Sequence, residues 1–234
     1  MLPHLMYKNM QKGMAVKKLS VYSTPEEVPS RLAELGLSQE ILREAVERGL
    51  AAWASCTLNH PAPFPGIAAW AETVNALRER LIPEGWVRTN NENLPLTTDK
   101  AGRVCISAST GDENTGRADA SPCTRSSKGP RTRSAVTDNA RQYRLFEDIR
   151  LRPEELDEIN GKMTWILLFY RDTTTEEVRS ELSRPIKMNI DGQVAGWAER
   201  IILGSSPFGG DRVEVPTDVP QTPNVIVKVT RRSA

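Results

Sequence analysis

The residues of this chain that are best suited to chemistry lie in one polar, glycine-punctuated stretch, residues 111–150. From Arg117 to Arg150 the stretch carries eight cationic and four acidic side chains, in a chain whose net charge is only +1. Hydroxyls and glycine amides alternate with these cations, and the mixture suits phosphate because cations supply charge while hydroxyls and amides supply directed hydrogen bonds. A helix beginning near Ser134 would add the positive end of its dipole. The predicted phosphate or nucleic-acid contacts are Arg117, Arg125, Ser126, Ser127, Lys128, Arg131, Thr132 and Arg133.

The same stretch allows two other interpretations. In the first, it is a solvated surface loop that binds nothing. In the second, it is the active site of a metal-dependent nuclease or a phosphotransferase-type enzyme, with Asp112 or Glu113 in a chemical role. Neither Gly111–Gly116 nor Ser126–Gly129 matches the Gly-x-x-x-x-Gly-Lys-Ser/Thr pattern of nucleotide-binding loops, and this argues against an ATPase.

Metal-ligating residues are sparse. The candidate ligands are Cys56, His60, Cys105 and Cys123. Cys56 and His60 have a usable spacing, but the other two cysteines are isolated and the chain has no Cys-x-x-Cys pair, so we expect no metal site and no other cofactor. Glu181 and Lys187 form no compact Glu-x-Lys nuclease pattern and are expected to be solvated strand charges. Three dispersed cysteines also fit a reducing compartment.

A second candidate for function is the pentapeptide Gln142-Tyr143-Arg144-Leu145-Phe146. It resembles the short peptide by which bacterial replication and repair proteins bind the DNA sliding clamp: a glutamine, two variable positions and then Leu-Phe. Gln142, Leu145 and Phe146 match that pattern, while Tyr143 stands where a small aliphatic residue is usual. The resemblance implies a partner-binding role for the three matching residues, with a sliding clamp-like protein as the partner. The alternative is that Leu145 and Phe146 are core positions of a helix, whose apolar period they fit.

The residues before this stretch are predicted to be helical. Thr24 is followed by Pro25 and two acids, which is typical of a helix start, and Ser38 is a candidate cap for a second helix. Apolar residues at helical spacing continue from there to Trp53. After a proline-rich connector, which cannot be helix interior, they resume over Ile67–Leu81. Two of these helices are therefore expected to be amphipathic and buried on one side.

Beyond residue 85 the pattern changes to short strands separated by turns. A short strand is also expected before the helices, at residues 17–22. The other predicted strands are residues 86–88, 94–98, 103–109, 163–170 and 224–230. Val178–Met188 is preferred as the returning arm of a hairpin over a helix at Thr175–Leu182, because Pro185 fits an edge strand. Helices are predicted at residues 134–149, 154–159 and 194–203.

These elements predict an α+β fold: a helical N-terminal third followed by a strand-rich, mainly antiparallel region with a few packed helices. The expected organisation is an N-terminal extension (1–22), a helical subdomain (23–84) and an α+β region (85–234) that contains the basic loop, residues 111–134. No apolar run is long enough to span a bilayer. The N-terminus also lacks the continuous apolar core of a secretory signal, so the predicted location is the cytoplasm.

The favoured hypothesis is a bacterial-type nucleic-acid-binding protein that contacts the phosphate backbone, within a DNA replication, repair, or mobile-element or defence assembly. The near-zero net charge excludes a uniformly basic nucleic-acid binder but leaves room for a local basic patch. The alternatives are the nuclease or phosphotransferase described above, and a protein–protein adaptor that acts through Gln142–Phe146. Phosphate contacts carry no sequence information, so these residues indicate neither DNA nor RNA.

Overall fold

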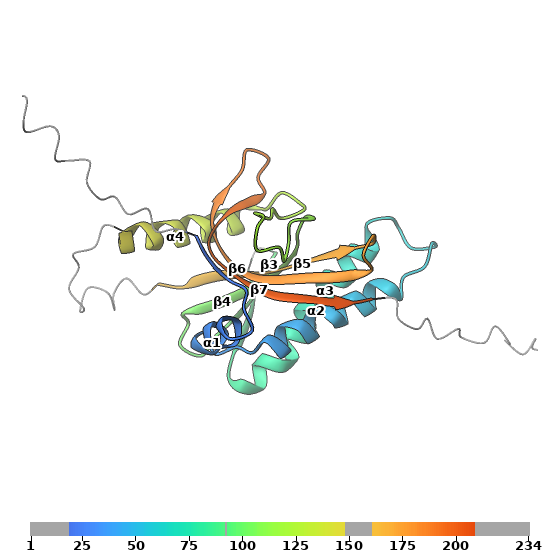
Figure 1. Ribbon diagram of the computed structural model, residues 1–234, viewed down its shortest axis with the longest axis horizontal. Helices are drawn as coiled ribbons and strands as arrows, with labels where there is room; N and C mark the ends of the chain where they lie inside the picture. Colours follow the sequence, from blue (N-terminus) through green and yellow to red (C-terminus); the bar gives the residue numbers. More distant parts are fainter. Residues whose placement is uncertain (1–18, 92, 148–160, 209–234) are drawn as a thin grey trace, which may run out of the picture.

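The computed structural model describes residues 19–91, 93–147 and 161–208. The strands are β1 (Ser20–Tyr22), β2 (Val87–Asn91), β3 (Leu94–Thr98), β4 (Val104–Thr110), β5 (Met163–Asp172), β6 (Glu177–Met188) and β7 (Val194–Pro207). The helices are α1 (Glu27–Glu34), α2 (Gln39–Ala54), α3 (Phe64–Leu81), the short 3-10 helix η1 (Ile82–Glu84) and α4 (Pro130–Glu147). Within the described residues a seven-stranded mixed sheet lies between α1–α3 on one face and α4 on the other (Figure 1). The predicted α+β class is confirmed.

The strand order across the sheet is β1-β7-β6-β5-β4-β3-β2. β4 and β5 are parallel, and so are β1 and β7, while the other neighbouring pairs are antiparallel. The sheet is therefore mainly antiparallel, as predicted. Because β4 and β5 are parallel, their carboxyl ends lie at the same end of the sheet. The basic loop leaves β4 at this end and runs into α4.

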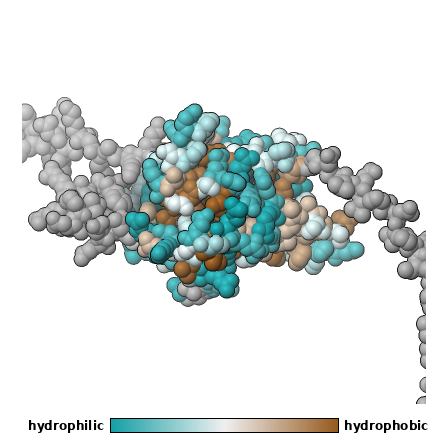
Figure 2. Space-filling view, turned by 90° about the horizontal axis from the view of Figure 1, so that it is seen from below, coloured by the Kyte–Doolittle hydropathy of each residue, from teal (hydrophilic) through white to brown (hydrophobic). Residues whose placement is uncertain are grey.

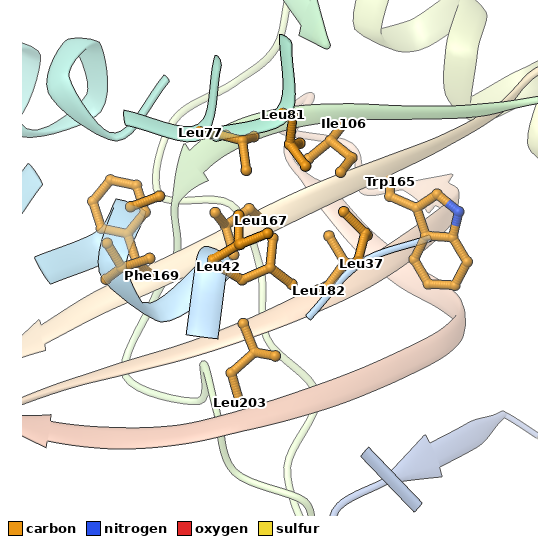
Figure 3. Packing of buried hydrophobic residues seen from close by; sticks show 14 of the residues in the cluster. Leu37, Leu42, Leu77, Leu81, Ile106, Trp165, Leu167, Phe169, Leu182 and Leu203 are labelled. Atoms are coloured by element: carbon orange, nitrogen blue, oxygen red, sulfur yellow. The ribbon is translucent and has the colours of Figure 1, made fainter. Parts of the chain in front are cut away.

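One hydrophobic core joins α1, α2 and α3 to the sheet. Figure 3 shows residues of the helices and of the sheet meeting in this core, among them Leu42, Leu77, Ile106, Leu167 and Leu182. The hydroxyl of Ser38 accepts a hydrogen bond from the Ile41 amide at 3.3 Å, which confirms the predicted cap of α2. The hydroxyl of Thr24 accepts one from the Glu27 amide at 3.2 Å, but α1 begins only at Glu27, two residues after the predicted first helical residue, Pro25. Seen from below Figure 1, the molecular surface is mostly hydrophilic, with small hydrophobic patches (Figure 2).

The opposite face of the sheet is covered by α4 and the basic loop. A smaller hydrophobic cluster on this face consists of Val136, Ile166, Leu168, Val194 and Trp197. Beside it, the buried Asn139 of α4 donates hydrogen bonds to the carbonyl oxygens of Thr164 (2.7 Å) and Pro185 (2.9 Å). The amide of Thr164 donates back to Asn139 Oδ1 at 3.0 Å. These bonds fix α4 on the sheet. The helix begins at Pro130, earlier than the predicted Ser134, because proline is favourable in the first turn.

The prediction of a helix at residues 194–203 is wrong, because these residues belong to β7. Val194 and Trp197 pack toward α4, whereas Ile201 and Leu203 belong to the core under α1–α3. The register between β6 and β7 shifts at several positions, and each irregularity disturbs the two-residue alternation of a strand. Since both faces of this strand are covered, its apolar positions imitate a helical period.

The other elements agree with the predictions or lie outside the described residues. β5 and β6 form the preferred hairpin, in which Ile166–Asp172 pairs with Glu177–Ser183. The strands expected before residue 111 are present as β1 to β4, with small shifts of their ends. The predicted helix at 154–159 and strand at 224–230 lie outside the described residues. The division of the chain at residue 85 stays a prediction; the helices on one side of it share a core with the sheet on the other.

No helix in the described ranges has both the length and the apolar character needed to cross a membrane.

Candidate functional site

The first half of the basic loop is held by hydrogen bonds within the loop and by a close contact with the sheet. The carboxylate of Asp112 accepts hydrogen bonds from the amides of Asn114 (3.2 Å) and Cys123 (3.0 Å), so it closes the loop on itself. Gly111 and Thr124 form an isolated antiparallel bridge at its base. Gly116 has a φ of +74°, and a Cβ there would lie 2.8 Å from the Cβ of Arg179. The loop can approach the sheet this closely only because residue 116 is glycine.

A buried ion pair anchors this half of the loop to the sheet. Glu181 of β6 and Arg200 of β7 both have fully buried side chains, with 2.5 Å between Arg200 Nη2 and Glu181 Oε2. Arg200 also donates to the carbonyl oxygens of Arg117 (2.9 Å) and Ala120. Glu181 in turn accepts from the amide of Gly116 (2.8 Å). The pair thus bonds to loop backbone at three points, and the carboxylate of Glu181 is fully engaged.

The second half of the loop is held by the turn between β6 and β7. The amide of Thr124 donates to the carbonyl oxygen of Val194 (2.9 Å), and the amide of Val194 donates to Thr124 Oγ1 (3.0 Å). Further along, the amide of Lys128 donates to the carbonyl oxygen of Gly192 (2.8 Å). Because backbone groups make these contacts, the side chains of residues 125–127 are left exposed to solvent. These hydrogen bonds hold this half of the loop in a defined shape, and whether it binds a ligand or is only solvated stays open.

Three of the predicted phosphate contacts meet at the start of α4. Ser127, Lys128 and Thr132 line a cavity of about 190 Å³, together with Ser107 and Ser109 of β4. The residue before the helix is Gly129, which has no side chain to cap the first amides. The ammonium of Lys128 makes no hydrogen bond or ion pair with the described residues, and burial lowers its pKa from the ordinary value. A positive charge, the hydroxyls of Ser127 and Thr132 and a helix N-terminus therefore meet at this cavity.

A basic groove continues from this cavity along α4. Arg133 and Arg141 of α4 and Lys187 of β6 line a groove of about 420 Å³, and all three side chains are exposed. Arg141 has a long ion pair with Asp138, at 3.7 Å. A Cβ placed on Gly192 would lie 3.4 Å from Ser127 Cβ and 3.8 Å from Arg133 Nη2, so the cavity and the groove are neighbours. Lys187 is distant from α4 in the sequence, and no local pattern could have assigned it to this surface.

We call this combined surface the α4 basic surface; it consists of Ser127, Lys128, Thr132, Arg133, Arg141 and Lys187. The structure places three other predicted contacts elsewhere. Arg131 faces β3, in a depression that it shares with Lys162. Arg125 lines a separate cavity beside α2 and α3. Arg117 lies toward Asp172, whose pKa is lowered mainly by the hydrogen bond from the Thr174 amide, with the charges of Arg179 and Arg117 adding to the effect. Ser126 is exposed between Arg125 and Ser127.

The residues of the sliding-clamp resemblance all lie on α4. Gln142 is part-exposed and its side-chain amide donates to the carbonyl oxygen of Lys162 at 3.4 Å. The side chains of Leu145 and Phe146 lie outside the part of the chain whose side chains the structure describes. The partner-binding role of Gln142, Leu145 and Phe146 therefore stays a prediction.

The candidate metal ligands are dispersed. His60 accepts a hydrogen bond from the amide of Thr57 (2.9 Å) and stacks on Phe64, with 4.9 Å between the ring centroids. Cys56 donates to the carbonyl oxygen of Ala52. Among the described residues, no three His, Cys, Asp or Glu side chains gather in a group that could hold a metal ion.

Comparisons with protein-family models, with curated proteins and with solved structures find no match to this chain. Function is therefore inferred from the geometry and charge of the surfaces just described.

Proposed function

We propose that the protein binds the phosphate backbone of a nucleic acid through the α4 basic surface. The observation that carries the proposal is the part-buried ammonium of Lys128, which has no acidic partner among the described residues and lies beside the N-terminus of α4. A partly desolvated cation without a counterion favours the approach of an anion, because the anion offsets the lost hydration. A phosphate would also accept hydrogen bonds from the hydroxyls of Ser127 and Thr132.

The length of the surface favours a nucleic acid over a single phosphate. Arg133 and Arg141 are eight residues apart on one helix, which corresponds to about 12 Å along its axis. Phosphates of one nucleic-acid strand recur about every 3.4 Å along a duplex axis, so this surface spans several of them. Such contacts position a protein without reading sequence, and we propose no sequence preference. A cytoplasmic, bacterial setting in DNA replication, repair, or mobile-element or defence assembly is part of the proposal.

The test is fluorescence anisotropy of the full chain with single-stranded DNA, duplex DNA and RNA at several salt concentrations. We expect the logarithm of affinity to fall linearly with the logarithm of salt, by roughly 0.7 to 0.9 for each phosphate contacted. The double variant Lys128→Gln/Arg133→Gln should bind more weakly and give a shallower slope. The matched control is Arg88→Gln/Arg103→Gln, which removes the same charge from exposed residues outside the α4 basic surface.

Equal affinities and equal slopes for the Lys128/Arg133 variant and the wild type would contradict the proposal. The enzymatic alternative has no specific observation in its favour, since Asp112 is engaged by loop amides and Glu181 by Arg200. Release of labelled fragments when Mg²⁺ is added to the same samples would revive the nuclease alternative. Binding to a sliding clamp that is lost in Gln142→Ala and Phe146→Ala would favour the adaptor instead.

A further inference from the structure

A second cavity, of about 260 Å³, lies between α2, α3 and the carboxyl ends of β4 and β5. Its walls include Val46 and Leu50 of α2, Ala69 of α3 and Phe169 of β5, so much of its lining is apolar. The volume is slightly below the roughly 300–1,000 Å³ of typical ligand pockets, which suits a small molecule. Ligands in proteins with parallel strands commonly bind where the carboxyl ends of neighbouring strands open.

The guanidinium of Arg171 forms part of this cavity and lies between two aromatic rings. Its Cζ lies 3.6 Å from the centroid of the Trp53 ring and 4.6 Å from that of Phe208. It makes no hydrogen bond or ion pair with any described residue, and its Nε is buried without an acceptor. Burial also lowers the pKa of Arg171 from its ordinary value. Aromatic rings hold the cation in place while its hydrogen-bond donors stay unused.

The rest of the polar lining is also cationic or neutral. Arg125 borders the same cavity, and its amide donates to the carbonyl oxygen of Thr110 at 3.0 Å, which fixes the start of its side chain. Thr110 and Thr173 are also in the lining, and no acidic residue is among the described residues that form it. The neighbouring Asp172 is paired with Arg179 at 3.2 Å, and consecutive strand residues point to opposite faces of the sheet. Nothing described in the cavity neutralises the two arginines.

We propose that this cavity binds a small organic anion. Its carboxylate or phosphate group would be bound by Arg171 with help from Arg125, and its apolar body would lie against Val46, Leu50 and Phe169. Arginine suits this role because its planar fork of donors matches both kinds of anionic group. The site is separate from the α4 basic surface, and the inference does not depend on nucleic-acid binding.

The first experiment is calorimetric titration of the full chain with four probes: phenyl phosphate, benzoate, inorganic phosphate and benzyl alcohol. Phenyl phosphate or benzoate should bind saturably, and the tighter of the two identifies the anionic group. Inorganic phosphate lacks the apolar body and benzyl alcohol lacks the charge, so each should bind at least tenfold more weakly. The proposal would be overturned if neither phenyl phosphate nor benzoate bound saturably. It would also be overturned if inorganic phosphate or benzyl alcohol bound as tightly as the better aromatic anion.

Two variants locate the site. Arg171→Met keeps an unbranched stem beside Trp53 but removes the charge, and it should weaken the better aromatic anion at least tenfold. Gly66 borders the cavity, and a Cβ there would meet no other atom within 4 Å, so Gly66→Leu should obstruct the cavity with the fold intact. Arg88→Gln is the charge-matched control and should bind as the wild type does. Wild-type binding in both cavity variants would overturn the proposal.

The same variants separate this proposal from the proposed function. Lys128→Gln/Arg133→Gln should lose nucleic-acid affinity and retain the aromatic anion, while Arg171→Met should do the reverse. Loss of the aromatic anion in the Lys128/Arg133 variant would place it on the α4 basic surface and would overturn the cavity assignment.

Discussion

Arg200 and Arg171 belong to the same sheet but differ in whether their guanidinium groups are hydrogen-bonded within the protein. Arg200 is fully buried, and all three of its guanidinium nitrogens donate hydrogen bonds, to Glu181 and to carbonyl oxygens of the basic loop. Arg171 lies on the other face, stacked on Trp53, with no hydrogen bond to any described residue. In Arg200 each guanidinium nitrogen donates within the protein, whereas the donors of Arg171 are available to a ligand.

This difference separates structural charge from charge that is available to a ligand. A buried, paired arginine contributes little net stability over an apolar replacement of the pair, but loss of one partner leaves the other charge buried and unpaired. An arginine without a partner stabilises the fold less, and its unused donors can bind an external anion. The same reasoning distinguishes Lys128 from Arg48 of α2 and Arg80 of α3, which have acidic partners.

The largest expected effect comes from breaking the buried pair. Arg200→Met should lower the free energy of unfolding by about 3–5 kcal/mol, because Glu181 is left as a buried charge and loop carbonyls lose their donor. Arg171→Met should lower it by about 1 kcal/mol or less, since only the contacts with the aromatic rings are lost. Urea unfolding of both variants measures the contrast. Equal losses would mean that Arg171 is a structural residue as well.

A smaller effect is expected where the loop touches the sheet. Gly116→Ala places a Cβ 2.8 Å from Arg179 Cβ at a positive φ, so we expect a loss of about 1–3 kcal/mol. Nucleic-acid affinity should fall too if the loop is displaced. Gly129→Ala is the matched control, because a Cβ there meets nothing within 4 Å, and its stability should stay within about 0.5 kcal/mol of the wild type. Comparable losses in the two variants would argue against the close contact at residue 116.

The smallest effect concerns pH. Burial lowers the pKa of Lys128 in the folded protein, so the unfolded chain binds more protons over the interval between the lowered and the ordinary pKa. Stability should therefore rise with pH through this alkaline interval, as the unfavourable charged form of Lys128 is relieved. Lys128→Met should lack this rise, and urea unfolding of the two proteins across the interval tests it. A parallel pH dependence in both would show that Lys128 is well solvated.

Local patterns predicted much of the fold. The cap at Ser38, the apolar run of β5 and the hairpin to β6 depend on neighbouring residues, and each could be predicted from the sequence. The strand β7 could not be predicted in this way. Its irregular register depends on the pairing with β6, and because both of its faces are covered, polar and apolar residues do not alternate along it. The spacing of apolar residues therefore predicted a helix at residues 194–203, where tertiary packing makes a strand.

The candidate sites were predictable only in part. Ser127, Lys128 and Thr132 share a cavity because they are close in sequence and flank the start of one helix. Lys187 joins the same surface because β6 lies beside α4, and Arg171 meets Trp53 only because α2 packs on the sheet. Residues so far apart along the chain form no sequence motif that could predict these contacts. The sequence also does not show that Arg171 lacks an acidic partner, because this depends on which residues fold around the cavity.

The anchoring of the basic loop by Arg200 has a consequence for the order of events during synthesis. Arg200 follows Ala120, one of its loop partners, by 80 residues. The loop thus leaves the ribosome long before the strand that holds it, and a chain that ends before β7 would carry the cations without their arrangement. Growing chains that end before β7 should therefore lack the folded form of the half of the loop that Arg200 anchors. A synthetic peptide of the loop, or a graft of it onto another scaffold, should lack the geometry for the same reason.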